Sequence, residues 1–204
     1  MERGRFITFE GIDGAGKSTQ IDAVESFLKE AGLEVVRTRE PGGTPLGEKV
    51  RALLLQEPMT VTTETLLFFA ARAEHVETVI EPALARGAWV LSDRFTDATY
   101  AYQVGAKGFS GERCEALERW TLSDFAPFKT ILFDLPPAVA NQRRQKRQGE
   151  SDRFEREQED FFHRVRNAYL DRAKRAPERF VIVDAQKTPE AIRAELLAEV
   201  AQWL

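Results

Sequence analysis

The 204-residue sequence has little of several features that would each define a class of protein. Its single cysteine, Cys114, excludes a disulfide within the chain and a cysteine-rich metal site. It contains no run of about 20 apolar residues, so no membrane-spanning helix is expected. No basic segment followed by an apolar run stands at its start, so no secretory signal is expected. These absences predict a cytoplasmic protein that does not associate with membranes.

Positive charge is not in excess either. The chain has 29 Lys and Arg residues against 33 Asp and Glu residues, giving a net charge of −4. Proteins that bind nucleic acid mainly through its phosphates normally carry a basic surplus, so nucleic acid is not an expected partner. A hydrophobic content of 43% and a charged content of 30% are typical of a globular protein, and the length suits one domain over residues 1–204.

Short apolar segments alternate with helical periodicity along the whole chain. The apolar segments cover residues 5–10, 33–38, 88–92, 129–134 and 179–184. This alternation predicts an α/β fold in which helices cover both faces of a parallel sheet. Neither a repeat nor a linker divides the sequence, so we expect insertions between strands within a single domain.

The helical periodicity also gives approximate helix bounds. Helices are expected over residues 17–31, 46–57, about 63–86 and about 100–127, and from Thr188 to the C-terminus. Gly32 is placed as a C-cap of the first helix, and Thr188 before Pro189 is placed as an N-cap of the last. Pro82 is expected to kink or end the third helix.

A glycine-rich segment between the first strand and the first helix carries the most specific motif. Residues 11–18 read Gly-Ile-Asp-Gly-Ala-Gly-Lys-Ser and match G-x-x-x-x-G-K-[ST]. Glycines let the backbone N–H groups turn inward, and the helix that follows directs its positive end at phosphates. Lys17 is expected to reach the β- and γ-phosphates, and the Ser18 hydroxyl to ligate Mg²⁺. The predicted triphosphate site comprises Gly11, Ile12, Asp13, Gly14, Ala15, Gly16, Lys17, Ser18 and Thr19.

Two charged residues follow the third apolar segment. Asp93 is placed to hold Mg²⁺ directly or through water, and Arg94 could bridge donor and acceptor phosphates, because its guanidinium fork fits phosphate oxygens. An ordinary ion pair at a strand end is an equally compatible interpretation.

Basic residues crowd a polar segment beyond the fourth strand, namely Arg143, Arg144, Lys146, Arg147 and Arg153. One interpretation is a solvated helix end. The other is a basic flap that closes over phosphates, because open α/β sheets bind ligands at the carboxyl ends of their strands. The phosphate loop contains no arginine, and phosphoryl transfer needs cations around the transferring group. The flap is therefore the expected source of a catalytic arginine.

Other residues have structural interpretations. Phe68 and Arg72 lie four apart on one helix, so their side chains project side by side; on spacing alone this suits core packing with a surface arginine. His75 and His163 have no ligand-like neighbours in the sequence, so we assign neither a metal nor a general base to them. Buried helix positions are expected for Cys114, Phe161, Phe162 and Tyr169.

Four segments, taken together, resemble bacterial thymidylate kinases. They are Phe9–Ser18 with the phosphate loop, Thr38-Arg-Glu-Pro-Gly-Gly-Thr44, Asp93-Arg-Phe95 with Ala101-Tyr-Gln103, and Asp152-Arg-Phe-Glu155. The resemblance runs from end to end in the same order. It implies a P-loop NTPase three-layer fold with a five-stranded parallel sheet and a small lid at about 138–155. It also implies transfer of the ATP γ-phosphate to dTMP, giving dTDP and ADP, with Mg²⁺ as cofactor and a homodimer as the assembly.

The same resemblance implies roles for individual residues. Phe68 would stack on thymine, Arg72 would bond its carbonyl edge, and Tyr102 would crowd the ribose 2′ position. Asp13 would lie near the 3′-hydroxyl, and either Arg39 or Arg51 near the acceptor phosphate. The implied dTMP site is Asp13, Arg39, Pro41, Arg51, Phe68, Arg72, Arg94, Thr99, Tyr102 and Gln103. Thr99 differs from the serine or asparagine often found there.

The implied catalytic residues are Lys17, Arg94, Arg144 and Arg153. Gly14 and Ala15 in the loop, with a basic lid, resemble the variant of the family that carries its arginine in the lid. Lys146 and Gln148 stand where arginine is common in the family. The resemblance therefore does not identify which arginine supplies the catalytic guanidinium.

Three rival interpretations differ in testable features. A kinase for another nucleoside monophosphate would differ only in the base pocket. A switch-type GTP-binding protein would need an Asn-Lys-x-Asp segment, which the sequence lacks. A nucleic-acid-binding module built on residues 143–153 conflicts with the acidic net charge.

Overall fold

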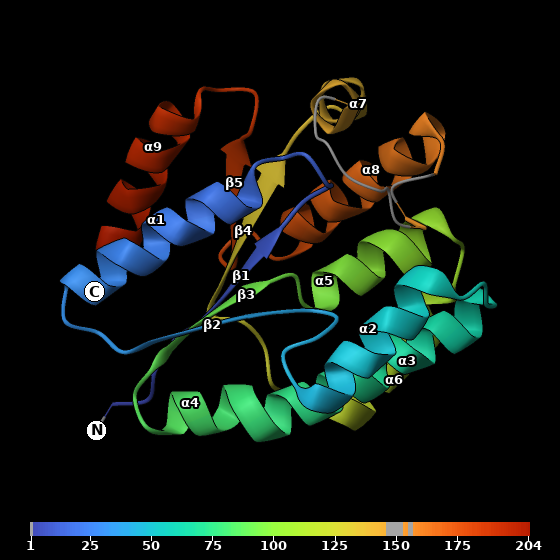
Figure 1. Cartoon of the computed structure of the whole chain (residues 1–204), viewed down its shortest axis with the longest axis horizontal. Coiled ribbons are helices and arrows are strands. Elements are labelled where there is room, and N and C mark those ends of the chain that lie inside the picture. Colours follow the sequence, from blue (N-terminus) through green and yellow to red (C-terminus); the bar gives the residue numbers. More distant parts are fainter. Residues whose placement is uncertain (1, 146–152, 155–156) are drawn as a thin grey trace.

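The fold is a five-stranded parallel sheet with helices on both faces. A computed structural model describes residues 2–145, 153–154 and 157–204. The strands are β1 (Phe6–Glu10), β2 (Val35–Arg39), β3 (Trp89–Asp93), β4 (Lys129–Asp134) and β5 (Phe180–Asp184). They follow the order β2-β3-β1-β4-β5, and every pair is parallel. This confirms the α/β fold expected from the alternating pattern (Figure 1).

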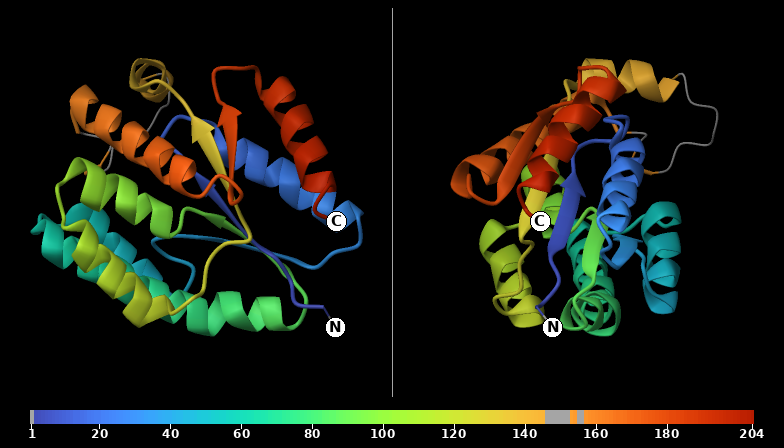
Figure 2. Two further views of the ribbon diagram at one scale, coloured as in Figure 1. Left: turned by 180° about the vertical axis from the view of Figure 1, so that it is seen from behind. Right: turned by 90° about the vertical axis from the view of Figure 1, so that its left-hand side faces the viewer.

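The helical elements connect the strands. They are α1 (Lys17–Glu30), α2 (Pro45–Gln56), α3 (Val61–His75), α4 (Glu81–Ala85), α5 (Thr96–Thr99), α6 (Gly111–Leu122), α7 (Pro137–Gln145), α8 (Glu159–Arg175) and α9 (Pro189–Ala201), with π-helical segments η1 (Val76–Ile80) and η2 (Tyr100–Ala106). Figure 2 shows α1 and α8 on opposite sides of the sheet, which gives the three layers. Helix α1 packs against α9, and α8 against η2.

Local sequence explains how these helices begin and end. In α1 the apolar residues Ile21, Val24 and Leu28 recur at helical spacing and are buried against the sheet. After this helix, Gly32 takes a left-handed φ of 83°, and its N–H donates to the Lys29 carbonyl at 3.0 Å, as expected of a C-cap glycine. The Thr188 hydroxyl accepts from the Ala191 N–H at 3.3 Å, which confirms the predicted N-cap of α9.

Two predicted helices differ from the observed ones. The segment expected as one helix over about 63–86 consists of three successive elements, α3, the π-helical η1 and α4. The helical segment continues through Pro82 to Ala85, so this proline does not end it. Pro82 lies in the first turn of α4, where a proline needs no N–H partner. The stretch expected over about 100–127 is two elements, since η2 ends at Ala106 and α6 begins after the capping residue Ser110.

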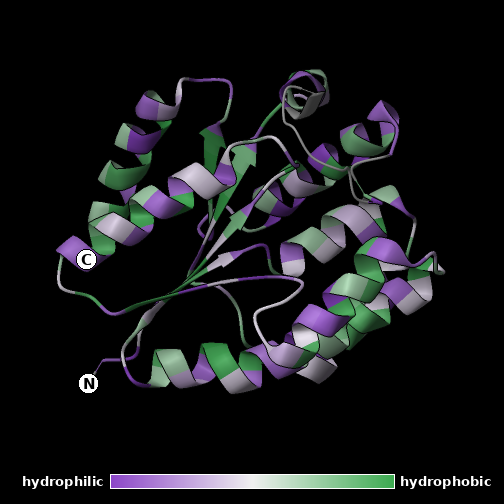
Figure 3. Cartoon of the chain, viewed as in Figure 1, coloured by the Kyte–Doolittle hydropathy of each residue, from purple (hydrophilic) through white to green (hydrophobic). Residues whose placement is uncertain are grey.

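The core lies on both faces of the sheet. The larger cluster packs β1 and β4, through residues such as Phe9 and Phe133, against α1, α8 and α9. A smaller cluster packs Phe6 and Val90 against Ile80 on the side of η1 and α4. In Figure 3 the helices carry alternating hydrophobic and hydrophilic bands, whereas β4 and β5 are largely hydrophobic.

Strand register determines which loops meet. Phe9 of β1 pairs with Asp93 of β3, and Arg39 of β2 pairs with Asp93 from the other side. The segments that follow these three strands therefore emerge together at the carboxyl edge of the sheet, which is the ligand-binding edge of open α/β folds. None of the helices in the described part of the chain is long and apolar enough to cross a membrane.

Candidate active site

The loop between β1 and α1 presents backbone donors and a lysine. Gly11, Gly14 and Gly16 have φ values of 131°, 89° and 85°, which side chains with a Cβ rarely adopt. Among the described residues, no side chain caps the start of α1 and its first turn carries no acidic residue. The free N–H groups and the positive end of the helix dipole therefore face the loop and suit an anion.

Lys17 is the first residue of α1, and its side chain reaches back over this loop. Its Nζ donates to the Gly11 carbonyl at 3.1 Å and lies 4.0 Å from Asp93 Oδ1. Burial, and next the positive charge of Arg94, lower the pKa of Lys17 below its ordinary value. A phosphate group bound in the loop would compensate this desolvated ammonium.

Asp93 and Ser18 offer oxygen atoms beside the lysine. The Oδ1 atom of Asp93 is buried and has no hydrogen-bond partner in the described part of the chain, and Ser18 is exposed on the first turn of α1. Mg²⁺ prefers oxygen ligands and is often held by one carboxylate together with substrate phosphates and water. These residues fit that mode. The described residues contain no group of three or more His, Cys, Asp or Glu that could hold a metal alone.

Arg94 extends from the end of β3 towards the phosphate loop. Its Nη2 donates to Asp13 Oδ1 at 3.0 Å and to the Tyr102 hydroxyl at 3.3 Å, and its Nη1 donates to the Tyr169 hydroxyl at 3.1 Å. Although burial disfavours the charge, Tyr102 and Asp13 raise the pKa of Arg94 above its ordinary value. The carboxylate that pairs with Arg94 is thus Asp13 of the loop, so the alternative of a simple Asp93–Arg94 ion pair does not describe this site.

Behind Arg94 lies a buried carboxyl group. Glu10, the last residue of β1, accepts from the Phe95 N–H and from the Tyr169 hydroxyl, each at 2.7 Å. Burial, and next the charge of Asp97, raise the pKa of Glu10 to about 8. Tyr169 is buried in α8 as expected, but its contacts with Glu10 and Arg94 were not predicted. The sequence did offer one indication of these contacts, a tyrosine at a core-facing position of a helix. A buried tyrosine O–H usually finds a hydrogen-bond partner.

A pocket of about 100 Å³ opens next to Asp13 and Arg94. Nine of the ten residues expected to bind dTMP line it: Asp13, Pro41, Arg51, Phe68, Arg72, Arg94, Thr99, Tyr102 and Gln103. Its other lining residues are Glu40, Leu55, Phe95, Ala98 and Phe154. The remaining candidate, Arg39, pairs instead with Glu48 at 2.9 Å between Nη2 and Oε2. Arg51 donates from Nη1 to the Pro41 carbonyl at 3.0 Å.

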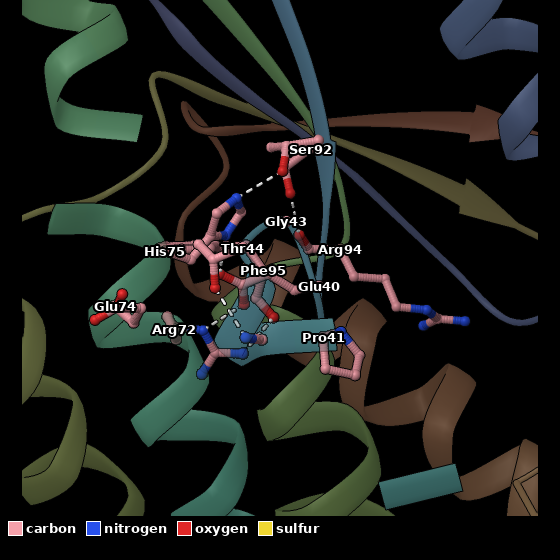
Figure 4. Close-up of polar contacts among 12 residues, drawn as sticks. Glu40, Pro41, Gly43, Thr44, Arg72, Glu74, His75, Ser92, Arg94 and Phe95 are labelled. Atoms are coloured by element: carbon pink, nitrogen blue, oxygen red, sulfur yellow. Dashed lines mark hydrogen bonds and ion pairs between the residues drawn. The ribbon is translucent and has the colours of Figure 1, made fainter. Parts of the chain in front are cut away.

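Arg72 is buried, unlike the surface arginine that spacing alone suggested. Its Nε donates to Glu40 Oε2 at 2.6 Å, and its Nη2 donates to the Phe95 carbonyl at 3.2 Å and to Thr99 Oγ1 at 3.0 Å (Figure 4). Its Nη1 is buried and has no partner among the described residues. An unsatisfied buried donor costs about 1–3 kcal/mol, so this atom is suited to a ligand acceptor.

The partner of Arg72 was missed by the sequence interpretation. Glu40 directly follows β2, and its carboxylate also contacts His75, a residue to which the sequence assigned no role. Nothing in the sequence pattern pairs Glu40 with residues more than 30 positions away on α3. The other histidine, His163, lies on α8 and is exposed, 3.7 Å from Glu159.

The basic segment contributes at both ends of the site. Arg143 Nη1 donates to the Gly14 carbonyl at 3.4 Å, which places it at the phosphate loop. Arg153 donates to the Glu57 carbonyl at 3.0 Å and contacts the Glu64 carboxylate, beside the pocket. Phe154 packs against Phe68 with ring centroids 6.4 Å apart. The side chain of Arg144 and residues 146–152 lie outside the described part of the chain.

Fold and site together define a P-loop nucleotide-binding protein whose phosphate loop adjoins a second pocket. The family model described as thymidylate kinase matches residues 9–196. A thymidylate kinase of Methylobacillus flagellatus is 57% identical over 96% of both chains. One of Thiobacillus denitrificans is 55% identical over 95% of this chain and 94% of the relative.

A solved structure agrees with these relatives. The crystal structure of thymidylate kinase from Ehrlichia chaffeensis superposes with a TM-score of 0.79 at 32% identity, over 97% of this chain and 99% of the other. The chain belongs to the thymidylate kinase family.

Proposed function

We propose that this protein transfers the γ-phosphate of ATP to dTMP, giving dTDP and ADP. The observation that carries the proposal is the pocket beside the phosphate loop, which Arg72 lines, together with the buried Nη1 of this arginine, which has no hydrogen-bond partner in the described part of the chain. A buried donor at this pocket suits the carbonyl edge of thymine. The half-buried ring of Phe68, one helical turn away, offers a face for the base.

The donor nucleotide would bind at the other end of the site. Lys17 and the N–H groups of residues 11–19 would hold the ATP phosphates. Mg²⁺, held by Ser18 and Asp93 directly or through water, would neutralise charge on the β- and γ-phosphate oxygens.

Arg94 stands between the two substrates. Its guanidinium reaches Asp13 of the phosphate loop and also lines the acceptor pocket. It would hold the dTMP phosphate in line with the γ-phosphate of ATP. An acceptor phosphate oxygen then forms a bond to the γ-phosphorus while the bond to the β-γ bridging oxygen breaks, and ADP leaves. The acceptor is already an anion near neutral pH, so positioning and electrostatics suffice and no general base is required.

Arginines of the basic segment would complete the charge compensation. We assign this role to Arg144 or Arg153 of a lid over about 138–155. In the described structure Arg153 contacts Glu64 beside the acceptor pocket, so reaching the transferring phosphate would require it to exchange this partner.

A panel of acceptors tests the proposal. ADP release is followed in a coupled assay with ATP, Mg²⁺ and each of dTMP, dUMP, dCMP, dGMP, dAMP and the ribonucleotide of thymine. We expect dTMP to give the highest kcat/KM. The control variant Lys17→Met should lose activity with every acceptor, because it removes the cation of the donor site. A strong preference for a purine acceptor would contradict the thymidylate assignment and favour the rival, a kinase for another nucleoside monophosphate.

We also propose a homodimer built through α2, α3 and α6, working in the cytoplasm. Helix α3 packs against both α2 and α6, and the three helices expose large apolar side chains, among them Leu53, Leu66 and Trp120, the last 83% exposed. The burial of such exposed apolar side chains in a second copy of the chain would favour association. Sedimentation of Trp120→Glu should give a monomer, whereas Leu204→Glu, at an exposed apolar residue away from these helices, should stay dimeric. A wild-type monomer would contradict the proposal.

A further inference from the structure

A chain of polar contacts runs behind Arg72, away from the pocket. The two carboxylate oxygens of Glu40 have different partners: Oε2 accepts from Arg72 Nε at 2.6 Å, and Oε1 lies 3.0 Å from His75 Nδ1. His75 Nε2 lies 2.6 Å from the Thr38 hydroxyl. The exposed fractions of Glu40, Arg72 and His75 are 5%, 1% and 0%. Figure 4 shows His75 and Arg72 reaching Glu40 from the same helix.

The chemistry of these groups sets the direction of each hydrogen bond. An ionised carboxylate only accepts, so His75 Nδ1 carries the proton that it donates to Glu40. With the proton on Nδ1, the Nε2 atom of the ring can accept from the Thr38 hydroxyl. All the contacts thus agree in direction, from Thr38 through His75 to Glu40, with Arg72 donating from the other side.

The imidazole ring is held in place on its far side as well. Gly43 has a φ of 78°, and a Cβ there would lie 2.4 Å from His75 Nε2 and 2.5 Å from Thr38 Oγ1. The loop after β2 therefore packs directly on the bond between Thr38 and His75, and only glycine allows that approach. The ring is thus held between the Gly43 backbone, Thr38 and Glu40, and this placement orients the Glu40 carboxylate.

The carboxylate in turn fixes the guanidinium. A guanidinium is planar and rigid, so holding Nε against Glu40 and Nη2 against Phe95 and Thr99 determines where Nη1 points. That atom can only donate. It therefore favours a base with a carbonyl at position 4 and disfavours one with an amino group there, because an amino group would face it with another donor.

We propose that His75, supported by Thr38, is a positioning residue for base recognition. It orients Glu40 so that Arg72 holds a 4-carbonyl pyrimidine and rejects a 4-amino pyrimidine. This inference rests on the proposed function, since it takes the acceptor to be dTMP.

The test compares dTMP with 5-methyl-dCMP, which replaces the carbonyl at position 4 by an amino group. Dissociation constants of both are measured by titration calorimetry for wild type, His75→Leu and His75→Asn, with kcat and KM for ATP beside them. His75→Leu should lower the preference for dTMP about tenfold, the equivalent of losing one hydrogen bond to a charged group. The KM for ATP should stay close to that of wild type. His75→Asn keeps a donor near the Nδ1 position and should retain most of the preference.

A matched control and a milder variant complete the design. His163→Leu removes a histidine whose side chain is 51% exposed. This variant should leave the dissociation constants of dTMP and 5-methyl-dCMP unchanged. Thr38→Val keeps the side-chain shape and removes only the hydroxyl, so it should lower the preference in the same direction without unfolding the protein. If His75→Leu does not fold, Thr38→Val and His75→Asn decide the question.

Two results would overturn the inference. If wild type binds and phosphorylates dTMP while His75→Leu and Thr38→Val keep the wild-type preference, His75 is a structural residue and not a positioning one. If wild type does not use dTMP at all, the proposed function fails and the inference fails with it. The wild-type measurement therefore separates the two failures.

Discussion

Replacing the buried carboxyl group behind Arg94 should change how stability depends on pH. Glu10 has a pKa raised from 4.5 to about 8, chiefly by burial. The folded protein therefore retains a proton between these values that the unfolded chain releases, so wild-type stability falls as pH rises through this window. Within it, each pH unit costs about 1.4 kcal/mol of unfolding free energy, and the full cost across it is at most about 5 kcal/mol.

The variant Glu10→Gln removes the titrating group and keeps the shape. Its amide oxygen can still accept from the Phe95 N–H, and its amide nitrogen can donate to the Tyr169 oxygen in place of accepting from it. Guanidinium chloride unfolding is measured from pH 5 to pH 8.5. Relative to wild type, the variant should gain unfolding free energy steadily as the pH rises. Glu34→Gln, which alters an exposed carboxylate paired with Arg86, should follow wild type throughout.

A constant difference between Glu10→Gln and wild type across this range would refute the reasoning, because it would mean that Glu10 does not change its protonation there. A difference that shrinks as pH rises would also contradict it, since a carboxyl group with a lowered pKa stabilises the folded state at high pH.

Three further outcomes are expected. Arg72→Lys keeps a positive charge opposite Glu40 but loses the guanidinium fork, so the KM for dTMP should rise about tenfold with little change in the KM for ATP. An unchanged KM for dTMP would exclude a contact between Arg72 and the thymine base. Arg144→Ala and Arg153→Ala should be tested singly, and at least one should lower kcat by about 10³-fold or more with dTMP affinity nearly constant; normal turnover in both would remove the lid from the mechanism. Burial raises the pKa of the Cys114 thiol to about 11, so the native protein should resist a thiol reagent at pH 8 that labels the unfolded chain fully. Rapid native labelling would show that the helices around Cys114 open readily.

Much of the site could be predicted because its parts are local in sequence. The phosphate loop joins β1 to α1 through residues 11–16 alone, and its glycines together with Lys17 carry the motif directly. Asp93 ends an apolar strand and Arg94 follows it, so strand order alone brings them to the ligand edge. The five strands were placed within two residues of their observed ends for the same reason, since buried parallel strands are continuous apolar runs.

What the sequence did not predict depends on contacts between distant residues. The burial of Arg72 is possible only because Glu40, 32 positions earlier, compensates its charge. Tyr169 meets Glu10 across 159 residues, and no helical period shows that its hydroxyl faces a carboxyl group. The π-helical turns at Val76–Ile80 and Tyr100–Ala106 were not predicted either, since the sequence interpretation placed ordinary helix over both segments.

A crystal structure with dTMP and a non-hydrolysable ATP analogue, grown with Mg²⁺, tests the central claim most directly. We expect the thymine carbonyl at position 4 to accept from Arg72 Nη1, the base to lie on Phe68, and the triphosphate to occupy residues 11–19. The same structure would show which lid arginine approaches the γ-phosphate. A base bound outside this pocket, with Arg72 Nη1 still lacking a partner, would contradict the account.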